Sequence, residues 1–310
     1  MMNLKNKLSL NKEKLTLRTS NKQDPGSLII VATPIGNMGD FSDRAKITLE
    51  NVDVVAAEDT RNAKKLALLS NINLKKIVSY NDNSSNNKKS QIMNFLKSGM
   101  DVALISDAGM PLISDPGYKL VSECLKINIQ VKNIPGPSSV LASLVVSGLP
   151  TDKFFFAGFP PKKKTIRRSF LISSSKIPST TIWFESPKRL IKLLKEIKEI
   201  FGNRNAVVTR ELTKLHEEII RDRIEDIIHK LSDRENIKGE VVLVVSPPEN
   251  YEEKTLDSKL LKEIEQLLKL ETFRNTVDMV VAKTGISRNL IYKECLTIKK
   301  NLINKTLKLK

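Results

Sequence analysis

Short apolar runs alternate with Pro- or Gly-bearing polar turns and with longer helical segments through the first half of the chain. The run 28–32 is continuously apolar, which is typical of a strand buried on both faces of a parallel sheet. Similar strands are predicted over 52–57, 102–105 and 129–134. Strands that alternate with helices at this spacing indicate a parallel α/β sheet with right-handed crossovers.

Two polar residues are predicted to start helices in this region. Ser42 can cap a helix that runs through Arg44 to Leu49. Asp115 is a good N-cap and Pro116 a good first helical residue, so a second helix is predicted to run from there to Lys126.

The second half of the chain repeats the α/β pattern and then changes character. Leu149-Pro150-Thr151-Asp152 predicts a domain boundary, and strands follow over 154–159, 180–185, 206–211 and 239–246. The tail reads as three short helices, and its turn at 284–288 resembles a helix-turn-helix. We therefore predict a flexible basic arm (1–26), an N-terminal α/β domain (27–150), a C-terminal α/β domain (151–247), a linker at 247–250 and a helical basic tail (258–310).

Charge is concentrated in three segments of the 310-residue chain. The whole chain carries 52 Lys and Arg against 35 Asp and Glu, a net charge of +17. Segments 1–26, 153–178 and 273–310 carry +4, +7 and +7, which leaves the remainder at −1. This pattern favours a polyanionic partner. Solvated surface charge in a lysine-rich chain is the alternative.

Several classes of protein lack support in the sequence. No run reaches the ~18–20 apolar residues of a membrane span, and the first 26 residues lack the apolar stretch of a secretory signal. We expect a cytoplasmic protein without a membrane partner. Two cysteines and two histidines leave too few ligands for a tetrahedral zinc site, so no metal is expected. The chain has no P-loop, no G-x-G-x-x-G and no G-x-S-x-G.

Four polar or Gly/Pro-rich loops follow the strands of the first domain, at 33–37, 58–61, 106–111 and 135–139. Ligands of open parallel sheets bind beyond the carboxyl ends of the strands. The four loops together therefore predict a ligand site, although each loop alone could be a plain connector.

These loops also carry a resemblance. The segments 31–37, 57–61, 106–117 and 135–139 resemble the tetrapyrrole methylase superfamily and, within it, the ribosomal RNA small subunit methyltransferase I family. The second domain is similar through 156–160, 183–189 and 210–214. The resemblance covers about 27–247, and the tail resembles that family's C-terminal module. The N-terminal arm is longer than the family leads us to expect.

The resemblance implies a two-domain α/β enzyme with a helical appendage that uses S-adenosyl-L-methionine and works as a homodimer. The family methylates the ribose 2′-OH of a cytidine in the decoding region of 16S rRNA, with the cofactor folded in the cleft between domains. The cofactor contacts that it implies here are Thr33, Pro34, Asp107, Ala108, Gly109, Met110, Ser138, Ser139, Leu212 and Gly239.

Methyl transfer to a weakly acidic hydroxyl needs alignment and a proton acceptor, and it needs no metal. Glu58 and Asp59 follow a strand and could supply the base, while Arg61 could stabilise charge or hold a phosphate. The alternative for this trio is a helix N-cap with a local ion pair, and both remain open here.

The cationic segments gain candidate roles under the RNA interpretation. Phosphate contacts are predicted from Lys162, Lys163, Lys164, Arg167 and Arg168, and from Arg288 and Lys293 in the tail. A solvated helix face and a purely structural helical bundle are the respective alternatives. For the protein as a whole, the alternatives are a precorrin-type tetrapyrrole methyltransferase and a non-catalytic nucleic-acid-binding protein.

Overall fold

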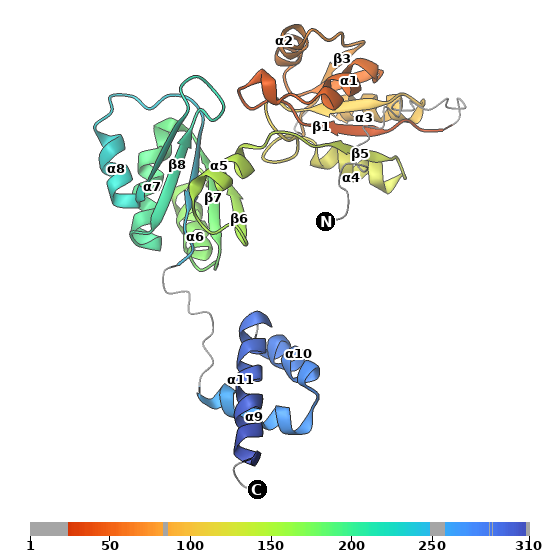
Figure 1. The fold of residues 1–310 in the computed structure, drawn as a ribbon. Coiled ribbons are helices and arrows are strands. Elements are labelled where there is room, and N and C mark those ends of the chain that lie inside the picture. Colours follow the sequence, from red (N-terminus) through yellow and green to blue (C-terminus); the bar gives the residue numbers. More distant parts are fainter. Residues whose placement is uncertain (1–23, 83–85, 249–257, 285, 287, 308–310) are drawn as a thin grey trace. The chain divides into compact units, whose positions relative to one another are not determined.

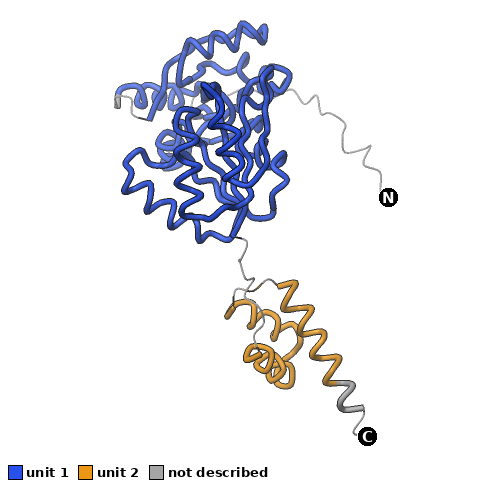
Figure 2. Tube along the Cα trace, turned by 90° about the vertical axis from the view of Figure 1, so that its left-hand side faces the viewer, with its two compact units in different colours: residues 1–248 blue, residues 249–310 orange. Residues whose placement is uncertain are grey.

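The computed structural model describes residues 24–82, 86–248, 258–284, 286 and 288–307, in two compact units (Figure 2). Unit 1 comprises residues 1–248 and unit 2 residues 249–310. The predicted basic arm lies outside the described residues except for 24–26. Within the described part of the chain, no helix is both long and apolar enough to cross a membrane.

The first sheet of unit 1 is parallel, as predicted for this half (Figure 1). It has five strands in the order β3-β2-β4-β1-β5, of which β3 was not among the predicted strands. Its strands are β1 (Leu28–Val31), β2 (Val54–Ala57), β3 (Ile77–Ser79), β4 (Val102–Ile105) and β5 (Val131–Ile134). The connecting helices are η2 (Met38–Asp40), α1 (Asp43–Asn51), α2 (Thr60–Ser70), α3 (Asn86–Lys97), α4 (Tyr118–Lys126) and α5 (Ser139–Ser147).

Both faces of this sheet are buried, which is why its strands are continuously apolar. Along β1, Leu28 and Ile30 belong to one core and Ile29 and Val31 to the other. Residues of α3 and α4 fill the first core, and residues of α1 and α2 fill the second. The carboxyl ends of the strands, where the candidate loops begin, therefore stand on a rigid base.

The second sheet is mixed, in the order β6-β7-β10-β8-β9, with only β6 and β7 parallel. Its strands are β6 (Phe154–Gly158), β7 (Thr180–Glu185), β8 (Asn205–Arg210), β9 (Glu218–Arg223) and β10 (Val241–Val245). Its helices are α6 (Lys164–Ser175), α7 (Pro187–Phe201) and α8 (Ile224–Ser232). These three helices and the buried Trp183 form the core on one face.

The other face of the second sheet is covered by α5. Val140 and Leu144 of this helix pack against Ile182 and Val207. Thus α5, which precedes the predicted boundary at 150, packs on the second sheet, where its apolar residues are needed to cover an otherwise open face.

One helix start differs from the prediction. The helix expected from Asp115 and Pro116 begins at Tyr118, and its N-cap residue is Gly117 at φ +136°. The preceding loop turns sharply, with Leu112 and Ser114 at positive φ. Because the loop turns there, Asp115 is not at the helix start and does not cap it.

Unit 2 is a bundle of α9 (Ser258–Leu270), α10 (Phe273–Thr284) and α11 (Arg288–Leu307). Its core includes Ile264, Val277, Val280, Ile291 and Cys295. At 20 residues, α11 is not the short helix that was predicted. The predicted turn does separate α10 from α11, but Gly285 and Ser287 within it lie outside the described residues.

Candidate active site

A cavity of about 370 Å³ lies in unit 1 where loops of the first sheet meet residues of the second. From the first sheet it is lined by Ile35, Asp107, Ala108, Ser114, Asp115 and Ser139. From the second it is lined by Phe159, Phe184, Glu185, Ser186, Pro187, Thr209, Leu212, Gly239, Glu240, Val241 and Val242. Three of the four predicted loops, 33–37, 106–111 and 135–139, thus contribute to the cavity, whereas no residue of the loop 58–61 lines it, and the second sheet completes the wall.

The loop after β4 is fixed by backbone hydrogen bonds to the loop after β1. The Thr33 N–H donates to the Gly109 carbonyl at 2.9 Å, and the Gly109 N–H donates back at 3.1 Å. Gly109 has φ +75°, and a Cβ there would lie 3.2 Å from the Ile35 side chain. Glycine therefore permits both the backbone conformation and the close approach.

Four carboxylates line the cavity, from Asp107, Asp115, Glu185 and Glu240, and no Lys or Arg is among its described lining residues. Burial raises the pKa of Asp115 above its ordinary value, and the negative charge of Asp107 raises it further. Glu185 is paired with Arg189 and Glu240 with Lys214, so among the described lining residues the unpaired negative charge of this wall comes from Asp107 and Asp115. That charge attracts a cationic ligand and repels phosphate.

The remaining wall is apolar. Phe159 and Phe184 lie with ring centroids 5.4 Å apart, and Leu212, Val241 and Val242 add aliphatic surface. A mostly apolar cavity with a few polar groups is the common form of a small-molecule site.

Leu212 is held between two residues in a sparsely populated backbone conformation. Glu211 and Thr213 have φ of +52° and +66°. The Glu211 carboxylate accepts hydrogen bonds from the Glu240 N–H and from Lys214 Nζ, both at 2.9 Å. These bonds offset the cost of the strained backbone and fix the position of Leu212.

Contacts at the same loop join the two halves of unit 1. The Asn37 N–H donates to Thr213 Oγ1 at 3.1 Å. A Cβ on Gly36 would lie 2.5 Å from the Lys214 side chain and 2.7 Å from Thr213 Oγ1. The lack of a side chain at Gly36 therefore lets the loop after β1 approach the loop that carries Leu212.

The predicted cofactor residues fall into three groups. Asp107, Ala108, Ser139, Leu212 and Gly239 line the cavity. Thr33 and Gly109 hold the loop through their backbones. The other three predicted residues, Pro34, Met110 and Ser138, are not among the lining residues.

Of these last three, two have structural positions that explain the difference. Met110 packs half-buried against the first core. Ser138 is the N-cap residue of α5, where its carbonyl accepts the Ala142 N–H.

Sequence reasoning missed two of the cavity's four carboxylates as ligand contacts. Asp115 was assigned to a helix cap, and Glu185 was given no role of its own, whereas Glu240 belongs to the turn 238–240 that the resemblance places near the adenosine. For Glu185 a signal existed, because it ends the predicted strand 180–185 and lies within a segment that carries the family resemblance.

Asp59 and Arg61 form the cap and ion pair that the sequence left open as an alternative. Asp59 Oδ1 accepts the Arg61 N–H at 2.8 Å, and Arg61 Nη2 lies 2.6 Å from Asp59 Oδ2. These hydrogen bonds from Arg61 lower the pKa of Asp59 to about 2. The Asp59 N–H in turn donates to Asp107 Oδ1 at 3.3 Å, which places this helix start beside the cavity loop.

Glu58 differs from its neighbours. Burial raises its pKa above the ordinary value, and the negative charges of Asp115, Asp107 and Asp59 raise it further. Glu58 is not among the residues that line the cavity, but it interacts electrostatically with two that are.

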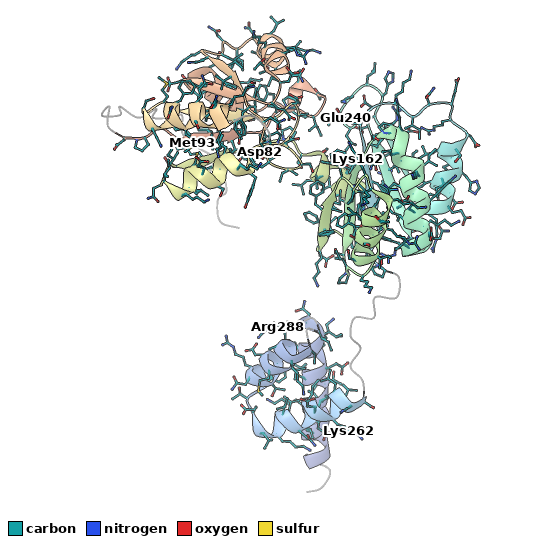
Figure 3. The ribbon with its side chains drawn as sticks, turned by 180° about the vertical axis from the view of Figure 1, so that it is seen from behind. Asp82, Met93, Lys162, Glu240, Lys262 and Arg288 are labelled. Carbon is teal, nitrogen blue, oxygen red and sulfur yellow. The ribbon has the colours of Figure 1, made fainter. Side chains whose placement is uncertain are left out.

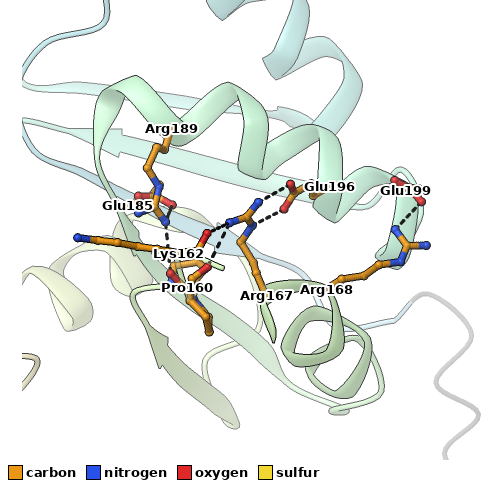
Figure 4. A network of polar contacts seen from close by, with 9 residues as sticks. Pro160, Lys162, Arg167, Arg168, Glu185, Arg189, Glu196 and Glu199 are labelled. Atoms are coloured by element: carbon orange, nitrogen blue, oxygen red, sulfur yellow. Dashed lines mark hydrogen bonds and ion pairs between the residues drawn. The ribbon is translucent and has the colours of Figure 1, made fainter. Parts of the chain in front are cut away.

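Among the predicted phosphate contacts, Arg167 requires correction. Its guanidinium is buried, with Nε 2.6 Å and Nη2 2.7 Å from the two Glu196 carboxylate oxygens (Figure 4). Its Nη1 donates to the carbonyls of Pro161 and Lys162. These hydrogen bonds give Arg167 a structural role, so the guanidinium is not available to contact a phosphate as predicted.

The other predicted cations remain at the surface. Lys162, Lys163 and Lys164 are exposed, and Arg168 makes an exposed ion pair with Glu199. In unit 2, Arg288 (labelled in Figure 3) belongs to α11. It pairs with Asp278, and Lys293 is exposed.

Comparisons with known proteins show to which family this architecture belongs. The sequence pattern of the Tetrapyrrole (Corrin/Porphyrin) Methylases matches residues 27–228. Ribosomal RNA small subunit methyltransferase I of Thermotoga maritima is 44% identical over 225 residues, which cover 72% of this chain and 100% of the relative. The Bacillus subtilis protein of the same name is 38% identical over 272 residues, 88% of this chain and 90% of the relative.

Solved structures agree on the fold. Uroporphyrin-III C-methyltransferase from Thermus thermophilus, complexed with S-adenyl homocysteine, is 17% identical, with a TM-score of 0.51 over 71% of this chain and 97% of that one. A diphthine synthase has a TM-score of 0.56 at 15% identity, over 71% of this chain and 89% of that one. With the parallel first sheet, the mixed second sheet and the cavity at their loops, these matches show that the chain belongs to the tetrapyrrole methylase family and, within it, to ribosomal RNA small subunit methyltransferase I.

Proposed function

We propose that this protein transfers the methyl group of S-adenosyl-L-methionine to the 2′-hydroxyl of a cytidine ribose in the decoding region of 16S rRNA. The observation that carries the proposal is the anionic and apolar cavity of a chain in this family. Such a wall suits a cofactor that combines a flat apolar base with a cationic sulfonium.

The residues of the cavity fit S-adenosyl-L-methionine. The aromatic and aliphatic wall around Phe184 and Leu212 would hold the adenosine, and the absence of a side chain at Gly239 lets Glu211, which anchors the Leu212 loop, lie close to it. The loop at Asp107 and Ala108 would face the methionine part through backbone groups and one carboxylate. When bound, the cofactor supplies a methyl group on a sulfonium, which needs an aligned acceptor oxygen and no covalent enzyme intermediate.

Proton removal from the acceptor hydroxyl is assigned to the carboxylate cluster of Asp115 and Glu58. Asp115 lines the cavity, and the pKa values of both carboxyls are raised, which makes each a better proton acceptor. Asp59 and Arg61 are then positioning residues: their ion pair fixes the start of α2, and the Asp59 N–H contacts Asp107.

The substrate surface in this proposal comprises Lys162, Lys163, Lys164 and Arg168 in unit 1, with Arg288 and Lys293 in unit 2. Exposed cations of this kind contact phosphates without reading sequence. We further propose that the enzyme works as a homodimer in the cytoplasm, as the family resemblance implies.

The test uses methyl-labelled S-adenosyl-L-methionine with small ribosomal subunits, naked 16S rRNA or a tetrapyrrole as acceptor. Label in one cytidine ribose, recovered as a 2′-O-methylated nucleoside after digestion, is the expected result. Label on an RNA base, or only on the tetrapyrrole, contradicts the proposal. Absence of transfer to all three acceptors, with intact cofactor binding, contradicts it as well.

A further inference from the structure

A second cavity, of about 340 Å³, shares a wall with the first but has the opposite charge. It is lined by Lys162, Arg167, Glu185, Arg189, Lys192 and Leu193. Lys162 lies two residues before the start of α6, and Arg189 comes from α7 (Figure 4). Lys192 and Leu193 also belong to α7. Four of these six residues are cationic and one is anionic, whereas the described lining of the cofactor cavity has no Lys or Arg.

The two arginines already have carboxylate partners. Arg167 is bonded to Glu196, and Arg189 Nη2 lies 2.8 Å from Glu185 Oε2. Arg189 Nη2 also donates to the Pro160 carbonyl at 3.3 Å. The arginine side of the cavity is therefore fixed in place by internal pairs.

The two lysines give the cavity its surplus charge. Lys162 and Lys192 are exposed, and none of the described carboxylates lies within ion-pair distance of either ammonium group. Lys192 acts on Glu196 only through its longer-range charge. An anion that enters the cavity would therefore meet two ammonium groups on a preorganised arginine wall.

Glu185 connects this cavity to the cofactor cavity, since it lines both. Its side chain is only 2% exposed, and its carboxylate accepts the Ser186 N–H at 2.7 Å as well as the Arg189 guanidinium. The shared wall is therefore rigid. On one side of it a phosphate is repelled by carboxylates, and on the other it is attracted by lysines.

Resting on the proposed function, we propose that this basic cavity, formed by Lys162, Arg189 and Lys192, binds the phosphate on the 3′ side of the methylated ribose. In RNA the 2′-hydroxyl is on the carbon next to the one that bears the 3′-phosphate. A phosphate held on the basic side of Glu185 would bring the 2′-oxygen to the cofactor side. The opposite charges of the two cavities thereby set the register of the RNA strand at the active site.

The test compares Lys162→Gln, Lys192→Gln and the double variant with Lys195→Gln. Lys195 is an exposed lysine of α7, like Lys192, but does not line the cavity, so its replacement removes the same charge as each single variant and does so outside the pocket. Each protein is assayed for binding to small ribosomal subunits and to 16S rRNA over a salt series, for S-adenosyl-L-methionine affinity by calorimetry, and for kcat and KM of methyl transfer.

The double variant is expected to bind RNA about tenfold more weakly. The slope of the logarithm of its binding constant against the logarithm of salt concentration should decrease in magnitude by about 1, which corresponds to the loss of one phosphate contact. Its KM for RNA should rise while its cofactor affinity stays at the wild-type value. A double variant that behaves as Lys195→Gln overturns the phosphate site.

The outcomes separate this proposal from the function on which it rests. If the wild type methylates a ribose but the double variant matches the control, the phosphate site is wrong and the function stands. If the wild type binds RNA through these lysines but transfers no methyl group to it, the proposed reaction is wrong and the anion site stands.

Discussion

The Arg167 guanidinium forms a two-pronged pair with the Glu196 carboxylate, which links α6 to α7 with only 7% and 19% of the two side chains exposed. We expect Arg167→Ala to lower the free energy of unfolding by about 3 kcal/mol, because it leaves a largely buried carboxylate without its partner. Urea denaturation measures this change.

The control is Arg168→Ala, on the same helix. Arg168 pairs with Glu199 between the same two helices, but 53% and 59% of those side chains are exposed. Water and salt screen such a pair, so the loss should stay below about 1 kcal/mol. Equal losses in the two variants would contradict the structural role given to Arg167.

The lowered pKa of Glu218 predicts that the free energy of unfolding depends on pH. Hydrogen bonds from Arg234 and then Arg210 lower its pKa from 4.5 to about 2. A carboxyl whose pKa is lowered by folding stabilises the protein above its unfolded pKa, and this contribution disappears as the pH falls through the folded value. The stability difference between wild type and Glu218→Gln should therefore be full at neutral pH and shrink between 4.5 and about 2. Denaturant titrations across that interval measure it, and a difference independent of pH would rule it out.

A substitution at Gly239 tests whether cofactor affinity depends on the position of Leu212 at the cavity. It has φ +94°, and a Cβ there would lie 2.5 Å from Glu211 Cγ, so Gly239→Ala must displace the residue that anchors the Leu212 loop. We expect cofactor affinity to fall at least about tenfold, measured by calorimetry, from a shift of that loop.

Gly202→Ala is the matched control. Gly202 has φ +84°, but nothing lies within 4 Å of a Cβ built there. It carries the same kind of backbone strain without a clash. This variant should lose some stability and keep wild-type cofactor affinity; a comparable loss of affinity would mean that strain alone explains the Gly239 result.

The carboxylate cluster predicts a graded effect on methyl transfer. Asp115→Asn and Glu58→Gln each remove a candidate proton acceptor. In the variant that lacks the carboxylate which accepts the proton, kcat should fall about 10²-fold or more. Asp59→Asn weakens a helix cap, so it should lower the free energy of unfolding and have only a small effect on kcat. Single-turnover rates at saturating cofactor distinguish the three, and full turnover in both Asp115→Asn and Glu58→Gln would exclude the cluster as the base.

Unit 2 should contribute to substrate binding and not to the cofactor site. A chain ended after Pro248 retains both sheets and all described lining residues of the cofactor cavity. It should bind S-adenosyl-L-methionine as the full chain does, but bind small subunits more weakly and with a smaller salt slope. Filter binding measures the second effect. Unchanged RNA affinity would instead support a purely structural role for the bundle.

The sequence by itself determined the family and the parallel α/β class of the first half, including four of its five strands. Continuous apolar runs are decisive for strands buried on both faces, and Ser42 caps α1 as predicted. The motifs after β1, β2 and β4 were recognisable because each lies within a short stretch of chain. Local patterns failed at Asp115, where a good capping sequence lies in a loop turned by residues at positive φ.

Only the tertiary structure decided which side chains are available for chemistry. Arg167 and Lys162 belong to the same basic segment, yet one is buried against Glu196 and the other is exposed beside a cavity. The partner lies 29 residues away on another helix, so no local pattern could reveal it. For the same reason the sequence could count the charge of the second domain but not its division by Glu185 into an anionic and a cationic cavity. That division depends on long-range packing of strands and helices, which sets the distance between charges and their exposure to water.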